Sequence, residues 1–178
     1  MGDPNLPLLR TFRFQVKLLK SPVVEAGFEA QLLTLGDVAT LLTGAALADG
    51  AFQECSGLDV DVDVQELQEG GRNDGVIRRL GRAKYSNLVL KRGMFYVEGD
   101  VDRELWDWVQ DAVSGVRPLR RYDGIVEVMS VGKTVVARWV FERGLPSKIA
   151  GPQLNAKTGE VAIEELHIAH EGLRLVPA

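Results

Sequence analysis

The chain has 178 residues, of which 46% are hydrophobic and 26% are charged, proportions that fit one globular domain with a substantial core. Its net charge of −4 provides no basic field to gather nucleic acid or anionic lipid, which argues against a dedicated DNA-binding protein. Cys55 is the single cysteine, so an internal disulfide and a cysteine-based zinc cluster are excluded. We expect synthesis in the cytoplasm, with no signal peptide and no membrane anchor, because the first residues lack a basic region followed by an apolar one.

The first predicted elements are a strand and a helix-prone segment. Apolar residues alternate with polar ones from Phe12 to Leu18, which predicts a half-buried strand. Between Phe28 and Ala48 apolar residues recur near helical spacing, with interruptions at Gly36 and Gly44. We therefore expect a helix-prone insertion at about residues 19–49.

Strand patterns fill most of the remaining chain, with one helix among them. Alternation predicts strands at residues 58–64, 88–90, 135–141 and 161–169. A helix is predicted from Asp102, which can cap its N terminus, to Gly115, which can end it. The apolar stripe expected to dock this helix on the sheet consists of Leu105, Trp106, Val109 and Val113. The sequence thus predicts a single mainly β domain over residues 1–178, a barrel or sandwich with one packed α-helix and the helix-prone insertion near the N terminus.

An acidic strand is the most unusual feature of the sequence. Asp59, Asp61 and Asp63 alternate with valines, so their carboxylates share one face of the strand. Their spacing matches the start of an EF-hand calcium loop, but that loop requires Gly and Glu where this chain has Val64 and Gly70. We expect the valines to face a core and the carboxylates to face water or a partner. A carboxylate-dependent hydrolase and a calcium- or carbohydrate-binding module remain as alternatives.

Other motifs favour structural roles over catalysis. The segment SVGKT matches the end of a phosphate-binding P-loop, but it lies between the strand patterns IVEVM and TVVARW, so a hairpin turn is favoured. His167 and His170 lack the helical spacing of zinc proteases, and each is expected to be a hydrogen-bonded structural histidine. Cys55 and Ser56 are not part of a nucleophile elbow. We therefore predict no catalytic residue, no metal ligand and no cofactor.

Five segments, in this order, carry a resemblance to a known family. They are ECSGLDVDVDVQELQEGG, GRAKYSNLVLKRG, DRELWDWVQDAVSG, VVARWVFERGLPSKIAGPQLNA and EVAIEELHIAHEGL. Together they resemble the tail tube proteins of contractile phages and phage-like contractile injection systems, over Leu9 to about Val16 and nearly all of Phe52 to Leu173. The resemblance implies a β-barrel or sandwich of the tail-tube type, a non-enzymatic subunit that forms hexameric rings. These rings would stack into a hollow tube inside a contractile sheath.

The resemblance also implies partners and sites. Expected partners are further copies of the chain, the sheath, baseplate and tube-initiator proteins, and cargo or DNA in the bore of an assembled particle. The face of Asp59, Asp61 and Asp63 is expected to line the bore or to meet a neighbouring subunit. The connection from Glu69 to Arg82 is expected to be a hairpin that contacts the adjacent ring through Arg72, Arg78, Arg79 and Arg82. The insertion at residues 19–49 departs from the short connection common in the family, so a tube-initiator or baseplate-proximal ring remains the alternative role.

Overall fold

The computed structural model describes residues 13–21, 46–50, 52–68, 70–71, 75–97, 100–157 and 159–177. The described elements are β1 (Phe14–Lys20), β2 (Ala46–Gly50), β3 (Phe52–Ser56), β4 (Val60–Leu67), β5 (Ile77–Tyr85), β6 (Leu88–Gly93), β7 (Tyr96–Val97), β8 (Asp100–Val101), α2 (Glu104–Val113), β9 (Tyr122–Met129), β10 (Val135–Ala150), β11 (Ile163–Ala169) and β12 (Gly172–Val176). The predicted fold class, mainly β with a single packed helix, is confirmed for this part of the chain.

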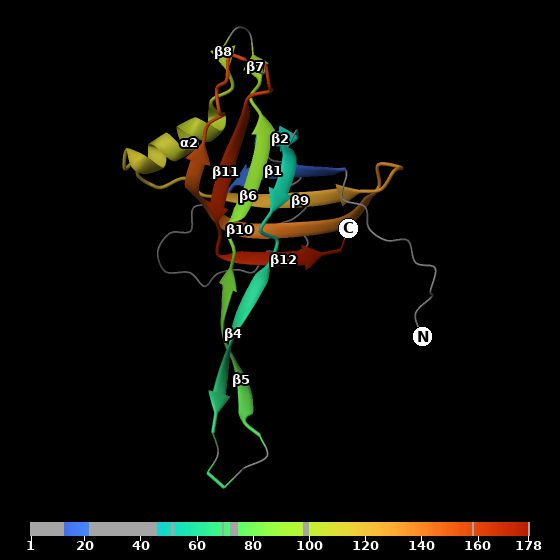
Figure 1. The fold of residues 1–178 in the computed structure, drawn as a ribbon, viewed down its shortest axis with the longest axis vertical. Helices are drawn as coiled ribbons and strands as arrows, with labels where there is room; N and C mark the ends of the chain where they lie inside the picture. The colour runs from blue at the N-terminus through green and yellow to red at the C-terminus, as the bar shows by residue number, and fades with distance from the viewer. Residues whose placement is uncertain are drawn as a thin grey trace.

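The body of the protein is an open sandwich built around the long strand β10. The first half of β10 pairs with β9 and β12 and, through β9, joins β1 and β2, which gives the first half-sheet. The second half of β10 pairs with β11, which leads to β6 and β3, and these strands form the second half-sheet. In Figure 1, β9 and β12 run across the view while β6 and β11 run along it. The order of hydrogen-bonded strands begins at β2 and ends at β3, which do not pair with each other, so the described strands do not close into a barrel.

A tight corner lets β10 pass from one half-sheet to the other. The register with β9 shifts between Phe141 and Gly144, and Arg143 has a positive φ of 55°. The Asp123 carboxylate stabilises this corner by accepting hydrogen bonds from the Arg143 backbone N–H at 2.7 Å and the Ser21 hydroxyl at 2.6 Å. Gly144 is required here because a Cβ would lie 2.8 Å from the carbonyl oxygen of Tyr122.

The core lies between the two half-sheets and under the helix. Its fully buried side chains come from β1, β9 and β10 on one side, from β6 and β11 on the other, and from α2. They include Val16, Leu18, Val126, Phe141, Leu88, Leu90, Leu166, Ile168, Leu105 and Trp108. On β6 the alternating pattern of the sequence predicts the inward positions Leu88 and Leu90, because one face of that strand is buried, whereas β9 is buried on both faces.

Two sequence predictions near the N terminus are corrected. β1 continues through Lys20, and Ala46–Gly50 form β2, which pairs antiparallel with β1. Both ends of the predicted insertion at residues 19–49 are therefore strands. Its remainder, residues 22–45, lies outside the described residues. Apolar residues recur at helical spacing as far as Ala48, but the last of them form a strand, because pairing with β1 overrides their local preference for a helix.

The predicted helix is present, but it is rotated relative to the expected docking stripe. Leu105 is buried and Val109 packs against the core, as expected. Trp108, which was not in the predicted stripe, is only 1% exposed, whereas Trp106 is half-buried and Val113 is 82% exposed. Val113 therefore does not dock the helix on the described part of the chain.

Both ends of α2 lie close to the predicted positions, but the N-cap residue comes one position later than expected. Arg103 occupies the N-cap position without a side-chain cap, and the carboxylate of Asp102 instead accepts the Glu104 backbone N–H at 3.0 Å. Gly115 has a φ of 76° just beyond the last turn, which confirms it as the C-terminal stop.

A buried ionic network fixes this helix to the second half-sheet. Arg92 on β6 pairs with Glu164 on β11 at 2.5 Å and with Asp102 at 3.0 Å. The indole N–H of Trp106 donates to the other oxygen of Glu164 at 2.9 Å. Every charged group in the network has a partner, as burial at this depth requires.

The segment SVGKT is a β-hairpin turn, which confirms the structural interpretation. It connects β9 to β10, which are antiparallel neighbours. Ser130 and Thr134 close the turn through a backbone hydrogen bond of 2.8 Å, and Lys133 has a φ of 63°. This geometry is that of a strand connection and not of a phosphate-binding loop opening a helix.

Candidate assembly interface

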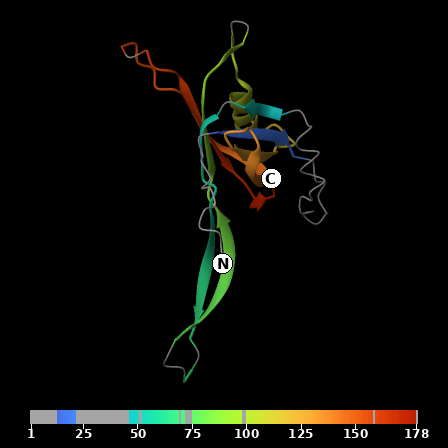
Figure 2. The same cartoon turned by 90° about the vertical axis from the view of Figure 1, so that its right-hand side faces the viewer.

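A two-stranded ribbon made of β4 and β5 projects from the body (Figures 1 and 2). Its pairing runs from Val60 with Tyr85 at the base to Leu67 with Ile77 near the tip. β4 follows β3 and β5 precedes β6, and β3 and β6 pair with each other in the second half-sheet. The ribbon, as we call β4 and β5 together, is thus an extension of that half-sheet beyond the sandwich.

The base of the ribbon is fixed by close contacts on both strands. Gly57 has a φ of 86°, and a Cβ there would lie 2.1 Å from the carbonyl oxygen of Asn87, so no other residue fits without displacement. The Asn87 side-chain amide donates to the hydroxyl of Ser147 on β10 at 3.3 Å. Tyr85 packs against His170 with ring centroids 5.5 Å apart. These contacts set the direction in which the ribbon leaves the body.

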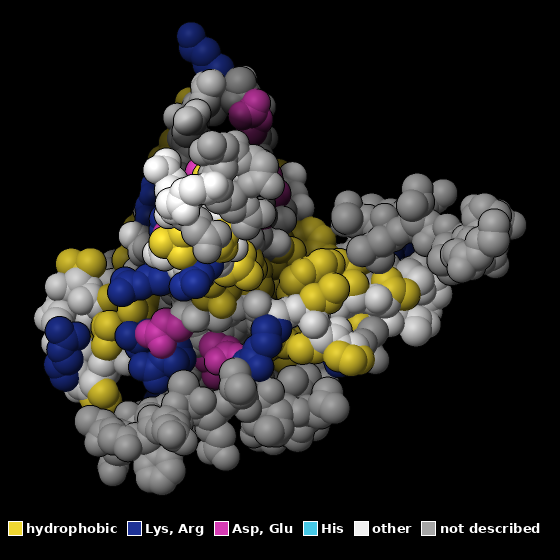
Figure 3. Space-filling view, turned by 90° about the horizontal axis from the view of Figure 1, so that it is seen from below, with side chains coloured by type: hydrophobic (Ala, Val, Ile, Leu, Met, Phe, Trp, Pro, Cys, Tyr) yellow, Lys and Arg dark blue, Asp and Glu magenta, His cyan; other side chains and the backbone are white. Residues whose placement is uncertain are grey.

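The ribbon has two chemically different faces, because paired residues share a face and successive residues alternate. The charged face carries Asp61, Asp63, Gln65, Arg79 and Lys84, and it ends near the tip in the apolar pair Leu67–Ile77. The apolar face carries Val60, Val62, Val64, Leu80, Ala83 and Tyr85, and a Glu66–Arg78 ion pair of 3.1 Å ends it near the tip. Viewed along the ribbon from below, hydrophobic side chains gather in a band across the molecule, beside groups of acidic and basic side chains (Figure 3).

The three aspartates do not act as one set. Asp59 precedes β4 and accepts a hydrogen bond from the Ser86 hydroxyl. Asp63 accepts from the ammonium of Lys84 at 2.8 Å, and this hydrogen bond, together with the charge of Asp63, raises the pKa of Lys84. Asp61 is exposed and lies opposite Lys84 in the register. The carboxylates thus face solvent beside basic partners.

Among the described residues, the expectation that the alternating valines face a core is wrong for Val60 and Val64, while Val62 is half-buried. Val60 is 48% exposed and Val64 is 56% exposed, and their neighbour Leu80 on β5 is 79% exposed. The physical reason is that the ribbon extends past the sandwich, so its apolar face meets no opposing sheet among the described residues.

The predicted arginines are divided between different positions. Arg78 pairs with Glu66, while Arg79 and Arg82 are exposed on β5. Arg72 lies outside the described residues. The three described arginines thus lie in strand β5 and not in a connecting loop, and the neighbours Arg78 and Arg79 point to opposite faces of the ribbon.

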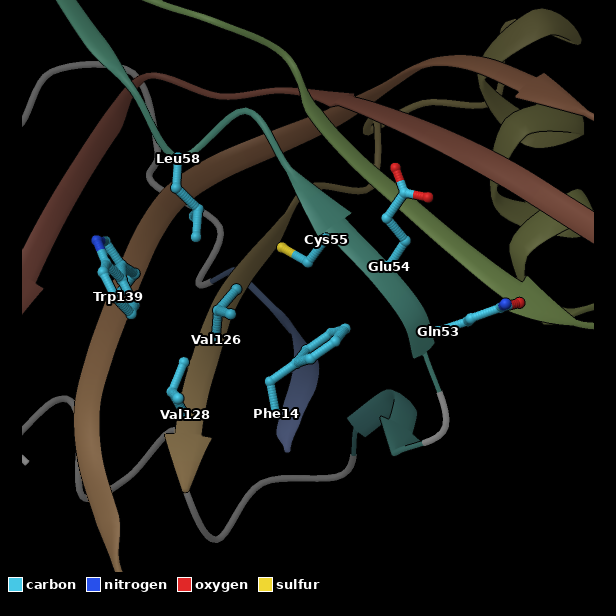
Figure 4. Close-up of a pocket in the computed structure, with 8 residues that line it drawn as sticks. All are labelled: Phe14, Gln53, Glu54, Cys55, Leu58, Val126, Val128 and Trp139. Carbon is cyan, nitrogen blue, oxygen red and sulfur yellow. The ribbon is translucent and has the colours of Figure 1, made fainter. Parts of the chain in front are cut away.

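A groove of about 270 Å³ opens between β3 and the first half-sheet. Figure 4 shows Phe14, Leu58, Val126 and Trp139 around it, with Cys55 among them, while the side chain of Glu54 points away. Burial raises the pKa of Cys55 to about 12, so the thiol is protonated at neutral pH and is a poor nucleophile. The groove is lined mainly by apolar side chains.

A charged ladder on the outer face of the second half-sheet was not predicted. Lys91 contacts Glu54 at 3.0 Å and Glu165 at 3.8 Å, and Glu165 contacts His167 at 2.6 Å. The hydrogen bond from His167 lowers the pKa of Glu165, and the hydrogen bond to Glu54 raises the pKa of Lys91. The two-residue spacing of Glu165 and His167 on a strand was the available signal, but the cross-strand partners needed the fold.

The described residues hold no group of three or more His, Cys, Asp or Glu side chains placed to bind a metal ion. No helix in the same part of the chain is long and apolar enough to cross a membrane.

Solved structures of contractile injection particles contain chains with this fold. A chain from the PVC extracellular contractile injection system, in a sheath–tube complex in the extended state, superposes with a TM-score of 0.71 at 17% identity, covering 98% of this chain and 95% of that chain. A chain from the cap of the anti-feeding prophage has the same TM-score and identity and covers 100% of this chain and 97% of that chain. Comparison with curated protein sequences finds no significant match.

The family follows from the sequence profile of the T4-like virus tail tube protein gp19, which matches residues 10–174. Because the match spans nearly the whole chain, the protein belongs to this tail tube family.

Proposed function

We propose that the protein is the structural subunit of the inner tube of a contractile injection system or contractile tail, in which hexameric rings stack into a hollow conduit. The observation that carries the proposal is the near-complete match to the tail tube family, over residues 10–174. The likeness to a chain of a sheath–tube complex, with almost full coverage of both chains, supports it. This role needs no catalysis, and the sheath, the baseplate and cargo in the bore are its partners.

The ribbon is the proposed contact between successive rings. It projects from one end of the subunit, and a surface that meets a different surface on the next copy gives the heterologous contact that closes rings or propagates filaments. Arg79 and Arg82 are exposed on it and support the proposal that basic groups take part in this contact. The charged face with Asp61 and Asp63 would then line the bore or an interface.

A terminal ring of the same machine is the second candidate. Similar chains occur in structures of the anti-feeding prophage baseplate, with a TM-score of 0.64, and of its tube-terminating cap. A main-tube subunit polymerises without limit, whereas a terminal subunit forms one ring and then stops.

Mass measurement and electron microscopy of the purified protein test the proposal. We expect rings with six times the 19.5 kDa mass of the chain, and hollow rods at higher concentration. Single rings that never stack would favour the terminal role. A chain that remains monomeric at every concentration and salt condition would contradict both roles.

A further inference from the structure

His170 lies where three parts of the chain meet at the base of the ribbon. Together with Glu171 it connects β11 to β12. Its ring packs on Tyr85, the last residue of β5, with centroids 5.5 Å apart, and on Phe141 of β10 with centroids 5.6 Å apart. The imidazole therefore lies in the joint between the ribbon and the body.

The surroundings of this ring suit a neutral imidazole. Both ring nitrogens are buried, and neither makes a hydrogen bond of normal geometry with a described residue. The expectation of a hydrogen-bonded histidine is thus confirmed for His167, which contacts Glu165 at 2.6 Å, and is wrong for His170. A protonated ring would bury a charge and two N–H donors, which is costly without partners. Burial accordingly lowers the pKa of His170, and the backbone of Gly172 and Ser86 opposes only part of the shift.

The carboxylates beside the joint already have partners. The charged or titratable residues next to these contacts, on each of the packed elements, are Asp59, Lys84, Tyr85, Arg121, Glu142, Arg143, Glu171 and Arg174. Glu171 pairs with Arg121 at 2.6 Å and with Arg143 at 2.7 Å, and Glu142 pairs with Arg174. Asp59 accepts a hydrogen bond from the Ser86 hydroxyl. To neutralise a proton on His170, one of these contacts would have to break.

The ribbon is the weaker side of the joint. On the side of the body, Phe141 is fully buried in the core, and the backbone N–H of Glu171 donates to the carbonyl oxygen of Glu142 at 3.0 Å. On the side of the ribbon, the side-chain hydrogen bond from Asn87 to Ser147 is long, at 3.3 Å. The ribbon also projects from the body as an arm that is attached at its base (Figures 1 and 2). The base of the ribbon should therefore move before the β11–β12 turn does.

We propose that His170 is an acid-sensitive joint: a neutral ring holds the ribbon in one direction, and a proton on the ring releases the base of the ribbon. Release exposes the imidazole to water, where its pKa returns to about 6.5, so the released form binds the proton more tightly than the closed form. The released population should therefore grow as the pH falls below ~6.5. The inference concerns the single subunit and goes beyond the proposed tube function.

Spin labels on two engineered cysteines measure the direction of the ribbon in the unassembled subunit. In a Cys55→Ser background, Arg79→Cys labels the ribbon and Val136→Cys labels the body, both at exposed positions. We expect the distribution of distances between the two labels to be narrow at pH ~7.5 and at least about twofold wider at pH ~5. Return to pH ~7.5 should restore the narrow distribution.

Variants of the two histidines separate the joint from other effects of acid. His170→Phe and His170→Gln cannot take up the proton and should keep the narrow distribution at both pH values, whereas His167→Gln should broaden like the parent. Broadening in a folded His170 variant, no broadening in the parent, or its loss in His167→Gln would overturn the inference. A loss of far-ultraviolet circular dichroism in the parent over the same pH range would also overturn it, because the whole subunit would then respond. None of these outcomes depends on assembly, so the tube function is tested separately.

Discussion

Trp108 should be the residue of α2 whose loss is most costly to the stability of the subunit. Its ring is 1% exposed and packs edge-on against Tyr122 with centroids 4.7 Å apart, and its indole N–H donates to the carbonyl oxygen of Arg120 at 3.0 Å. Truncation of a buried tryptophan to alanine costs about 3–5 kcal/mol through lost transfer energy and the cavity left behind. The aromatic pair contributes about 0.5–1.5 kcal/mol beyond burial, and the lost hydrogen bond about 1 kcal/mol. We therefore expect Trp108→Ala to cost about 5 kcal/mol.

Urea unfolding of the unassembled subunit, followed by far-ultraviolet circular dichroism, measures this loss. A loss of about 5 kcal/mol can consume the whole stability of a domain, so Trp108→Phe serves as a milder variant, with an expected loss of about 1–3 kcal/mol from the uncompensated carbonyl. Val113→Ala on the same helix is the control and should change stability by less than about 0.5 kcal/mol, because that side chain is 82% exposed. A smaller loss for Trp108→Ala than for Trp106→Ala would refute the docking geometry described above.

Three further predictions concern the ionic network, the base of the ribbon and the half-buried His170. Glu164→Gln should lower the free energy of unfolding in urea by about 3 kcal/mol, because it removes the more buried of the two carboxylates that neutralise Arg92; a loss under about 1 kcal/mol would show that the pair is solvated. Gly57→Ala should destabilise the subunit by at least about 2 kcal/mol more than Gly71→Ala, because both glycines have positive φ but only at Gly57 would the added Cβ collide with backbone; equal losses in thermal unfolding would contradict this. Desolvation lowers the pKa of His170, while the backbone of Gly172 and Ser86 opposes part of the shift. Stability should therefore be independent of this group above pH ~6.5 and should fall as the pH drops from ~6.5 towards the lower folded-state pKa, because only the unfolded chain takes up the proton there. In His170→Phe this part of the pH dependence should disappear, and an unchanged slope would show that another group is responsible.

Turns and glycine positions were the features that sequence reasoning predicted most reliably. Gly115 ends α2 with a positive φ, and the SVGKT segment forms the turn between β9 and β10. Both predictions depend on local stereochemistry, which the residues carry wherever they lie in the fold. The inward positions of strands such as β6 followed from alternation for the same reason.

The predicted docking stripe of α2 shows where local reasoning fails. A stripe through Leu105 and Val113 and a stripe through Leu105 and Trp108 both fit a period of 3.6 residues. The choice depends on how far the helix is rotated about its axis. The buried pair with Tyr122 and the hydrogen bond from Trp106 to Glu164 set that rotation, and both partners are remote in sequence.

The sequence alone determined that the acidic strand has two faces, one apolar and one charged, because alternation in a strand is a local property. Only the tertiary structure decided that the valine face is left open, since cover for a strand comes from segments distant in the chain and β4 extends beyond the sandwich that would provide it. Val60 and Val64 belong to one continuous alternating pattern with Leu58, which packs against the core at the base of the ribbon. Their exposure is set by how far the sandwich reaches along the ribbon, and that distance is a property of the packed fold and not of any short stretch of residues.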